Sequence, residues 1–415
     1  MLYPTSFVSL RQSPRVSIHN ALIEDWGDVF KKIGADPVSW LKMAQKATFV
    51  TFHIRGLSNK AATILKQEAL SKGGEAVISR ETLIDLSTTT DVLLALTERQ
   101  LYVLLGDLKN QPFGLAPLAV DIELTWSRYG QRPSPITIHD YPLDWNHAPY
   151  VMGILNITPD SFSDGGKYGT LNEAIAQADR MISEGANIID VGGESTRPCS
   201  EPVPAEEKIR RIIPVIEALC HKYPILIVSV DTTSSAVAKD ALRAGASIIN
   251  DVSAGLDDES LLGVVATYGT PYVLMHRSAP VAVMQDHTQY VDVVTDIYDW
   301  FTENIARCER AGITRNQIIL DPGIGFGKTV DQNLQLINRL HVFRGLGLPI
   351  LLGSSRKRFI GDTLDRDVTH REFGTAATLA ISTLQGANIV RVHSVSEMVD
   401  VVRMTQAIKE ECHDA

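Results

Sequence analysis

From residue 150 onwards the chain repeats one pattern: a short apolar run, a polar or Gly-containing loop, and a longer segment with apolar residues at helical spacing. The eight apolar runs lie near Tyr150–Asn156, Asn187–Val191, Ile225–Val230, Ser247–Asn250, Pro271–Met275, Gln317–Leu320, Pro349–Leu352 and Asn388–Val392. Runs that are apolar throughout predict strands of a parallel sheet covered on both faces. Eight strand–helix units within about 265 residues predict an α/β fold of the (β/α)8 TIM-barrel type. A doubly wound open sheet is the alternative, but its Gly-rich dinucleotide turn after the first strand is missing here.

The first 140 residues show a weaker pattern. Its segments are alternating strands at Thr48–Ile54 and Val120–Trp126, an amphipathic helix at Ser58–Leu70, and an apolar run at Asp91–Leu96. They predict a smaller α/β domain over residues 1–140, in which no catalytic signature occurs and whose role the sequence does not indicate. A Pro-rich stretch then predicts a linker at 141–149, followed by the barrel at 150–415.

Charge changes this picture, because it is unevenly distributed. The formal net charge is −10, yet residues 1–148 carry equal numbers of acidic and basic side chains, so the barrel is the acidic part. An acidic protein without a run of Lys or Arg is a poor binder of nucleic acid. Any anionic ligand must therefore be held by local clusters of basic residues.

The cysteines and the lengths of the apolar runs indicate where in the cell the protein is located. Cys199, Cys220, Cys308 and Cys412 are too few for a disulfide framework and too widely spaced for a metal motif, which predicts reduced thiols. No basic segment leads into an apolar core at the N-terminus, and no apolar run reaches the ~18 residues of a membrane helix. We therefore expect a cytoplasmic protein that does not span a membrane.

Polar residues follow each predicted strand, where a barrel of this type carries its chemistry. They are Asn156, Gly192–Pro198, Asp231, Asn250, His276, Asp321–Lys328, Gly353–Lys357 and Arg391–His393. Asp231, Asn250 and Asp321 would point into one bowl, where a carboxylate can accept parallel hydrogen bonds from a ring N–H and an adjacent amino group. One such residue can equally cap the next helix. The three together favour a site for a flat heterocycle with N–H edges.

Cations also follow the predicted strands. Arg197, Lys357, Arg391 and His393 indicate an anionic group on the substrate, because the last two loops of such barrels often hold phosphate. Surface salt bridges are the alternative for each cation. Arg391 and His393 alternate across one residue and should face the same side of their strand, which favours a shared target.

Three further features can be explained either by a functional role or by a purely structural one. Asp321–Lys328 is rich in glycine but lacks the spacing of a Walker loop, so its glycines are expected to allow close backbone approach to a flat ligand. His276 could be a general base or a satisfied core histidine. Cys199 lies in the second loop, but no His is near it in the sequence to activate it, so we do not expect a nucleophile.

At this level of detail the chain resembles a known family, the dihydropteroate synthases of folate biosynthesis. The matching motifs occur in the family's order, at Gly153–Gly166, Asp190–Pro198, Ser229–Thr232, Ile248–Asp251, Asp321–Lys328, Ser355–Lys357 and Arg391–His393. The resemblance implies an enzyme that joins p-aminobenzoate to 6-hydroxymethyl-7,8-dihydropterin diphosphate, releases pyrophosphate and uses Mg²⁺ on the leaving group. It also implies a homodimer and a sulfonamide target.

The resemblance also implies roles for individual residues, carried over motif by motif. Pterin contacts fall on Asp231, Asn250, Asp321 and Lys357, with Met275 and Phe326 packing on its faces and Gly353 in the substrate site. The Mg²⁺ ligand is Asn156, and the diphosphate falls to Arg391 and His393. Two loops that close the site bring Asp164, Thr196 and Arg197, and the p-aminobenzoate pocket takes Phe162, Pro198 and Lys357. Of these, Lys357, Asp164 and Arg197 are the expected catalytic residues.

Two departures and two alternatives accompany this resemblance. The loop after the fifth strand reads His276–Pro280 where many members have His-Met-x-Gly-x-Pro, and Arg358 replaces a small hydroxyl residue. A related pterin-binding methyltransferase would share the Asp and Asn contacts but would not need Arg391, His393 or Lys357. A non-catalytic pterin-binding protein would be expected to have lost Asn156, Arg197 or Lys357, all of which are present.

Overall fold

A computed structural model describes residues 26–85, 87–138, 141–157, 167–194 and 203–414. The chain divides into two compact units, one of residues 1–122 with 410–415 and one of residues 123–409. The division falls inside helix α5 (Leu115–Gly130), before the segment predicted as a linker. Among the described residues, no helix is long and apolar enough to cross a bilayer.

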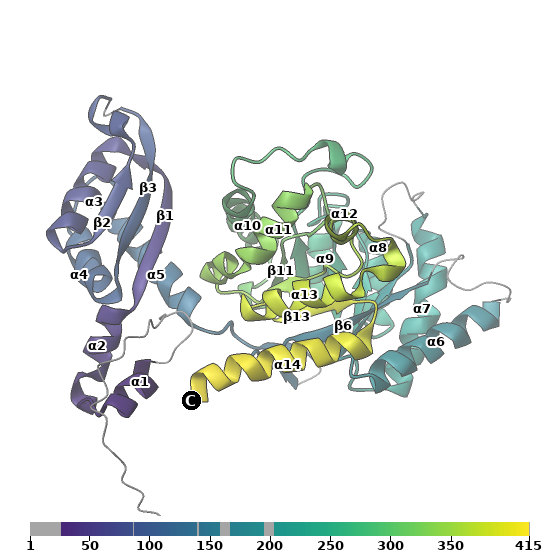
Figure 1. Ribbon diagram of the computed structural model, residues 1–415. Helices are drawn as coiled ribbons and strands as arrows, with labels where there is room; N and C mark the ends of the chain where they lie inside the picture. The colour runs from purple at the N-terminus through teal and green to yellow at the C-terminus, as the bar shows by residue number, and fades with distance from the viewer. Residues whose placement is uncertain (1–25, 86, 139–140, 158–166, 195–202, 415) are drawn as a thin grey trace, which may run out of the picture. The chain divides into compact units, whose positions relative to one another are not determined.

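The smaller unit is a three-stranded antiparallel sheet with helices (Figure 1). Its strands, in the spatial order β1-β3-β2, are β1 (Phe49–Ser58), β3 (Thr89–Thr97) and β2 (Glu75–Ile78). Its helices are α1 (Trp26–Ile33), α2 (Trp40–Ala47), α3 (Asn59–Ser71) and α4 (Glu98–Leu108). Helix α4 begins where it does because Thr97 and Gln100 form a reciprocal capping box.

One predicted strand of this region is wrong. Val120–Trp126 belongs to helix α5, not to a strand. The residues that α5 buries are Leu115, Ala119 and Ile122, which are spaced four and three apart and so lie on one helical face. The alternation of apolar and polar residues at Val120–Trp126 therefore arose by chance within a helical pattern of 3.6 residues per turn. The strand predicted at Thr48–Ile54 and the helix predicted at Ser58–Leu70 are confirmed by β1 and α3, and the apolar run at Asp91–Leu96 is part of strand β3.

The larger unit is the predicted parallel barrel. Its strands are β6 (Tyr150–Asn156), β7 (Ile188–Gly192), β8 (Ile227–Asp231), β9 (Ile248–Asp251), β10 (Tyr272–Met275), β11 (Ile318–Asp321), β12 (Leu351–Leu352) and β13 (Ile389–Val392). They pair in the order β11-β10-β9-β8-β7-β6-β13-β12, and a parallel bridge between Leu320 and Ile350 joins the two ends of that order. The (β/α)8 prediction is therefore confirmed.

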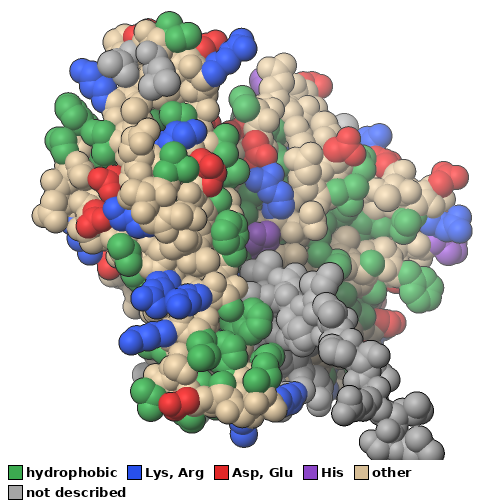
Figure 2. Space-filling model, turned by 60° about the vertical axis from the view of Figure 1, so that its left-hand side comes forward, with side chains coloured by type: hydrophobic (Ala, Val, Ile, Leu, Met, Phe, Trp, Pro, Cys, Tyr) green, Lys and Arg blue, Asp and Glu red, His purple; other side chains and the backbone are tan. Residues whose placement is uncertain are grey.

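Helices surround this barrel (Figure 1). They are α6 (Lys167–Ser183), α7 (Ala205–Lys222), α8 (Ser235–Arg243), α9 (Ser260–Tyr268), α10 (Val293–Arg310), α11 (Val330–Asn338), α12 (Arg358–Leu364), α13 (Glu372–Leu384) and α14 (Val395–Asp414). The largest apolar cluster joins the outward side chains of the strands to the inner faces of these helices. On the face drawn in Figure 2, acidic and basic side chains are interspersed, so the net charge of −10 is not gathered into one acidic area there.

The inside of the barrel has an apolar floor. It is formed by one inward side chain from each strand. Seven of these are buried, namely Met152, Ile188, Ile248, Val273, Ile319, Leu351 and Ile389, and the partly buried Ile227 comes from β8. A hairpin of β4 (Ile136–Ile138) and β5 (Tyr141–Leu143) packs against this floor together with Trp145, whose indole Nε1 donates to the backbone oxygen of Ser134 at 3.0 Å. The stretch predicted as a linker thus contributes to the hydrophobic cluster inside the barrel.

Candidate functional site

Above the apolar floor, the inward positions of the strands become polar. Since side chains alternate in and out along a strand, residues two and four places beyond the floor also point inward. These positions hold Asp190, Ser229, Asn250, Asp321 and Arg391, and then Asn156, Asp231 and His393. Asp251, which follows Asn250, takes the outward parity and accepts a hydrogen bond from the Tyr272 hydroxyl at 2.7 Å. The same period of two thus separates site residues from structural ones.

Arg391 is at the centre of this polar layer. Its Nε donates to Asp190 Oδ2 at 2.6 Å, and a terminal nitrogen donates to Asp231 Oδ2 at 2.8 Å. Asn250 Nδ2 donates to the same Asp190 oxygen at 3.0 Å, which directs the amide oxygen of Asn250 away from that carboxylate. Strands β7, β8, β9 and β13 are therefore joined through one guanidinium and two carboxylates.

Burial sets the electrostatics of this network. It lowers the pKa of the Arg391 guanidinium, but the neighbouring carboxylates of Asp190 and Asp231 outweigh it, and the net shift is upward. Burial also raises the pKa of Asp231 to about 7, against the opposing effect of Arg391. The carboxyl group of Asp231 can therefore exchange its proton near neutral pH.

Some acceptors in the layer have no partner among the described residues. Asp190 Oδ1 and Ser229 Oγ are both buried without a hydrogen bond, and the two residues are neighbours in the β7–β8 register. Buried polar atoms in native proteins are almost always paired with protein or with ordered water. These two atoms are thus available to a bound molecule or to water inside the barrel.

Asp321 and Lys357 form a second polar centre, at the ends of β11 and β12. Burial raises the pKa of Asp321, and the ammonium of Lys357 opposes that shift. Burial lowers the pKa of Lys357 to about 8, although Asp321 pulls it upward. The Lys357 ammonium donates to the backbone oxygen of Ile324 and lies 4.5 Å from the centre of the Phe326 ring. It is mostly protonated at pH 7.

An apolar wall stands beside these groups. Val252, Met275, Met284 and Phe326 form a separate buried cluster. Met275 and Phe326 are 2% and 8% exposed; Met275 ends β10, and Phe326 lies in the loop after the neighbouring strand β11. A flat ring could contact this wall while its edges meet the carboxyl and amide groups of Asp321, Asp231 and Asn250.

The loop after β10 is packed against the Gly-rich loop after β11. Gly323 has a φ of +67°, and a Cβ at this position would lie 1.9 Å from the backbone oxygen of His276, so only glycine fits. The buried Nζ of Lys328 bonds Gly323 O at 2.9 Å and Phe326 O at 3.0 Å, and lies 3.1 Å from His276 Nδ1. These contacts fix His276, the residue before the altered part of its loop, against the Gly-rich loop.

Of the two roles considered for His276, general base or core histidine, the structure favours the core histidine. Burial, and then the neighbouring Lys328, lower its pKa well below the ordinary range, and its ring lies edge-on to Trp300 with centroids 4.9 Å apart. A histidine held neutral and enclosed in this way is a poor general base. Arg277, one of the residues that depart from the family pattern, is itself buried and forms an ion pair with the exposed Asp257.

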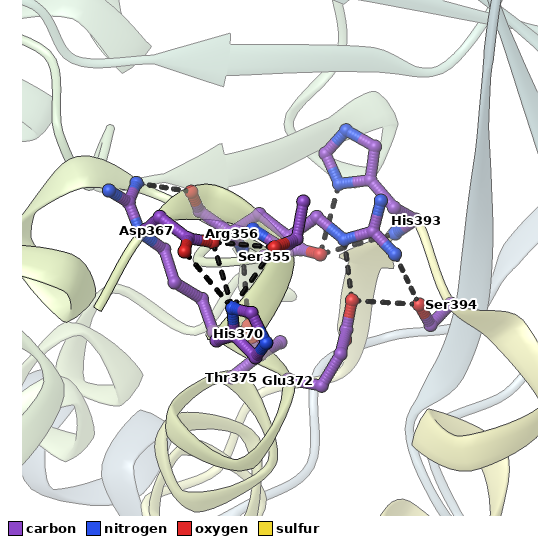
Figure 3. A network of polar contacts seen from close by, with 10 residues as sticks. Ser355, Arg356, Asp367, His370, Glu372, Thr375, His393 and Ser394 are labelled. Atoms are coloured by element: carbon purple, nitrogen blue, oxygen red, sulfur yellow. Dashed lines mark hydrogen bonds and ion pairs between the residues drawn. The ribbon is translucent and has the colours of Figure 1, made fainter. Parts of the chain in front are cut away.

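The loops after β12 and β13 form another network, drawn in Figure 3. His393 Nδ1 lies 3.0 Å from Ser355 Oγ, and the backbone nitrogen of His393 donates to the same oxygen at 3.2 Å. Arg356 pairs with Glu372 and donates to Ser394 Oγ at 2.8 Å. Arg356 thus braces the two loops, while Lys357, the next residue, points to Ile324 and Phe326.

The structure places ten predicted site residues at the carboxyl ends of the barrel strands or in the loops that follow them. They are Asn156, Asp231, Asn250, Met275, Asp321, Phe326, Gly353, Lys357, Arg391 and His393. Five others, namely Phe162, Asp164, Thr196, Arg197 and Pro198, lie outside the described residues. Asp190 was not predicted as a site residue. Its signal is a carboxylate inside an otherwise apolar strand, because such a group is almost never fully buried without a partner.

The donor set for a metal is sparse. The described residues contain no group of three or more His, Cys, Asp or Glu side chains that could hold a metal ion. Asn156 presents an amide at the end of β6, and a Cβ at Gly192 would lie 3.0 Å from its Oδ1, so the absent side chain leaves space there. Mg²⁺ often uses one or two protein oxygens, with waters and substrate phosphates completing its octahedron. Asn156 can therefore ligate Mg²⁺ only when a phosphate ligand and water supply the remaining oxygen ligands.

Comparison with known proteins identifies the class. A sequence profile described as "Pterin binding enzyme" matches residues 152–393, which run from within β6 to just beyond β13 and so include most of β6 and the whole of the other seven barrel strands. The chain belongs to this family of pterin-binding enzymes.

Within that family, the chain is a member of the dihydropteroate synthases. The dihydropteroate synthase of Synechocystis sp. is 44% identical over 277 residues, which are 66% of this chain and 96% of that protein. The solved structure of the Xanthomonas albilineans dihydropteroate synthase in complex with 7,8-dihydropteroate is 40% identical, with a TM-score of 0.60, and the match covers 66% of this chain and 98% of that one.

A third relative extends the match into the smaller unit. The probable bifunctional folylpolyglutamate synthase/dihydropteroate synthase of Haloferax volcanii is 39% identical over 388 residues, or 91% of this chain. A match of that extent includes most of residues 1–122. The chain spans about half the length of this relative, since the match covers 45% of it.

Proposed function

We propose that this protein condenses 6-hydroxymethyl-7,8-dihydropterin diphosphate with p-aminobenzoate, giving 7,8-dihydropteroate and pyrophosphate in folate biosynthesis. One observation carries the proposal. Asp231, Asn250 and Asp321 converge above the barrel floor with two partly buried cations, Lys357 and Arg391, beside an apolar wall. An aminopterin needs such acceptors for its N–H edges, and a diphosphate needs cations.

The pterin would be recognised by its hydrogen-bonding edge. A carboxylate of Asp231 or Asp321 can accept from a ring N–H and the adjacent amino group together, and Asn250 is held in one orientation by Asp190. A ligand without these donors would leave buried acceptors unpaired, which discriminates strongly against it. Met275 and Phe326 would contact the ring faces.

The leaving group would be bound nearer the mouth of the barrel. His393 is held by Ser355, and Arg391 has a further terminal nitrogen besides the two atoms that bind the carboxylates. Asn156 would hold Mg²⁺ together with diphosphate oxygens, and the ion would supply charge neutralisation for the departing pyrophosphate. The donor set supports this because it leaves most of the coordination sphere to substrate and water.

The reaction then needs little base catalysis. The bond between the pterin methylene and the diphosphate oxygen breaks, and its electron pair leaves with pyrophosphate. The aryl amine nitrogen forms the new bond to the methylene and releases one proton. The carboxylates of Asp231 and Asp321 would stabilise positive charge that develops on the pterin during departure. The Lys357 ammonium, which lies beside Phe326 of the apolar wall, would orient the second substrate.

The test is a pyrophosphate-release assay with purified protein, pterin diphosphate, p-aminobenzoate and Mg²⁺. We expect stoichiometric pyrophosphate and dihydropteroate, and no product when p-aminobenzoate is omitted. Transfer of a methyl group from methyltetrahydrofolate, in place of pyrophosphate release, would identify a methyltransferase. Binding of the pterin without turnover would identify a non-catalytic protein. Either result contradicts the proposal.

We also propose a cytoplasmic homodimer. The sequence supports the compartment because its four cysteines predict reduced thiols. Among the described residues Cys220 and Cys308 are free, and burial raises the pKa of Cys220 and raises that of Cys308 to about 12, so that both thiols stay protonated. The dimer rests on resemblance to the family alone. Sedimentation of the purified protein at micromolar concentration tests it, and a monomer would rule it out.

A further inference from the structure

A cavity lies away from the proposed active site. Its volume is ≈ 270 Å³, and it is lined by Arg128, Gln131, Arg132, Ser134, Arg315, Asn316, Gly347, Leu348 and Pro349. These residues come from the end of α5, the segment before β4, the short helix at Arg315–Gln317 and the turn before β12. All of them belong to the larger unit.

This cavity is at the base of the barrel. The helix at Arg315–Gln317 leads directly into the amino end of β11, and Gly347–Pro349 lead into the amino end of β12. The proposed catalytic groups stand at the opposite ends of the same strands. A four-residue strand separates the two ends by roughly 10 Å, at about 3.3 Å per residue. A ligand in this cavity is therefore distinct from the substrates.

The cavity is basic. Arg128, Arg132 and Arg315 line it, and Glu309 is the carboxylate that approaches them, with Oε1 3.5 Å from Arg315 Nη1. Arg315 also donates to the backbone oxygen of Leu346 at 2.6 Å. The guanidinium of Arg128 makes no hydrogen bond to any other side chain or backbone group that the structure describes. Gathered arginines of this kind are typical of phosphate sites.

The position of the Arg128 side chain is fixed by packing. Its side-chain stem lies on the turn at Gly347, whose φ is +71°, and a Cβ on that glycine would lie 2.8 Å from Arg128 Cγ. Burial, and then the like charge of Arg315, lower the pKa of Arg128, so the two guanidinium groups are close enough to repel each other. Such repulsion is relieved when an anion is placed between the two charges.

We propose that this cavity is a second ligand site that binds a phosphate or diphosphate group, with Arg128 and Arg315 as its main contacts and Arg132 at its rim. Gln131, Ser134 and Asn316 supply neutral hydrogen-bond donors around the same space. The site requires residues from α5 and the segment before β4, so it is formed only when these precede the barrel.

The experiment is calorimetric titration with inorganic phosphate and, separately, with pyrophosphate. The protein is first saturated with pterin diphosphate, in the absence of p-aminobenzoate, so that the proposed substrate site is filled and no turnover occurs. The variants are Arg128→Gln, Arg315→Gln and Arg132→Gln. Arg310→Gln is the matched control, because Arg310 is an exposed arginine near the end of α10 that does not line the cavity.

We expect saturable binding of at least one of the two anions to the wild type and to Arg310→Gln. Binding should weaken by at least about tenfold in Arg128→Gln and Arg315→Gln, as the loss of a charge-assisted contact predicts, and by less in Arg132→Gln. Turnover of the proposed substrates should be unchanged in Arg132→Gln. Thermal unfolding verifies that each variant is folded, and the exposed Arg132 gives a variant that does not depend on the packing of Arg128.

Three outcomes would overturn the proposal. They are no saturable binding of either anion to the wild type, equal affinity in the wild type and the folded Arg128→Gln and Arg315→Gln variants, and equal weakening in Arg310→Gln. If pterin diphosphate itself fails to bind, the proposed function fails, but the comparison of phosphate binding between these variants still decides the second site.

Discussion

The two ends of the barrel interior are made by the same strands and differ in almost every physical respect. At the base, one apolar side chain per strand meets Ile136, Ile138 and Trp145 in a closed hydrophobic cluster. At the carboxyl end, the next inward positions hold charges such as Asp190 and Arg391 with buried atoms left unpaired. Apolar burial stabilises the fold, whereas buried charge is costly unless it is paired. The apolar base therefore offsets the energetic cost of burying charged groups in the proposed site.

The largest expected effect comes from removing the base. A chain beginning at Glu123 keeps β4, β5 and Trp145, whereas one beginning at Tyr150 lacks all three. Losing several fully buried side chains, at about 2–5 kcal/mol each, costs on the order of 10 kcal/mol, which exceeds or matches the stability of many domains. We expect the longer chain to fold and release pyrophosphate, and the shorter one to be insoluble or unfolded by circular dichroism. Similar melting temperatures for both chains would show that the base adds little.

Arg391→Ala is the next largest. It leaves the fully buried carboxylate of Asp190 and that of Asp231 without their cation, and breaking a buried ion pair from one side costs about 3–5 kcal/mol. Because Arg391 joins the pterin acceptors to the predicted diphosphate region, binding of 6-hydroxymethylpterin and of its diphosphate should both weaken. Denaturant unfolding and calorimetry measure the two effects. Selective loss of diphosphate binding at normal stability would show that Arg391 acts on the leaving group alone.

Lys357→Ala should reduce kcat/KM by about 10²–10³, as expected for removal of one charged contact in a closed site. The matched control is Arg358→Ala, since Arg358 is the next residue in the chain and its side chain is 88% exposed beside Asp362. Steady-state kinetics with both substrates varied should show the loss for Lys357 and none for Arg358. Wild-type kinetics in the folded Lys357→Ala protein would remove Lys357 from the site.

The smallest effect is the pH dependence. Burial raises the pKa of Asp231 to about 7, so activity that needs its carboxylate should fall as pH drops below about 7. Burial lowers the pKa of Lys357 to about 8, so activity that needs its ammonium should fall as pH rises above about 8. A bell-shaped kcat/KM profile with about tenfold loss per pH unit on each limb follows. In Lys357→Arg the alkaline limb should move upward, and an unmoved limb would assign it to another group.

How much of this was visible in the sequence depends on the range of the interaction. The eight strands were predicted because their signal is local: each is a run of apolar residues bounded by polar loops. The same local signal was wrong at Val120–Trp126, where alternation overlapped with the helical face of α5. The sequence also did not predict that the stretch expected to be a linker packs against the barrel floor. The reason is that the short strands β4 and β5 are stabilised by contacts with strands that are distant in the sequence.

The sequence by itself determined which residues stand at the ends of the strands, and so the chemical groups available to the site. Only the tertiary structure decided their partners. Arg391 meets Asp190, 201 positions earlier, and His276 is held neutral by burial and then by Lys328, 52 positions later. Arg128 comes together with Arg315 and Gly347 at the base in the same way. Alternation along a strand is a property of neighbours in the chain, whereas burial and charge pairing depend on closure of the barrel, which joins residues that no local pattern relates.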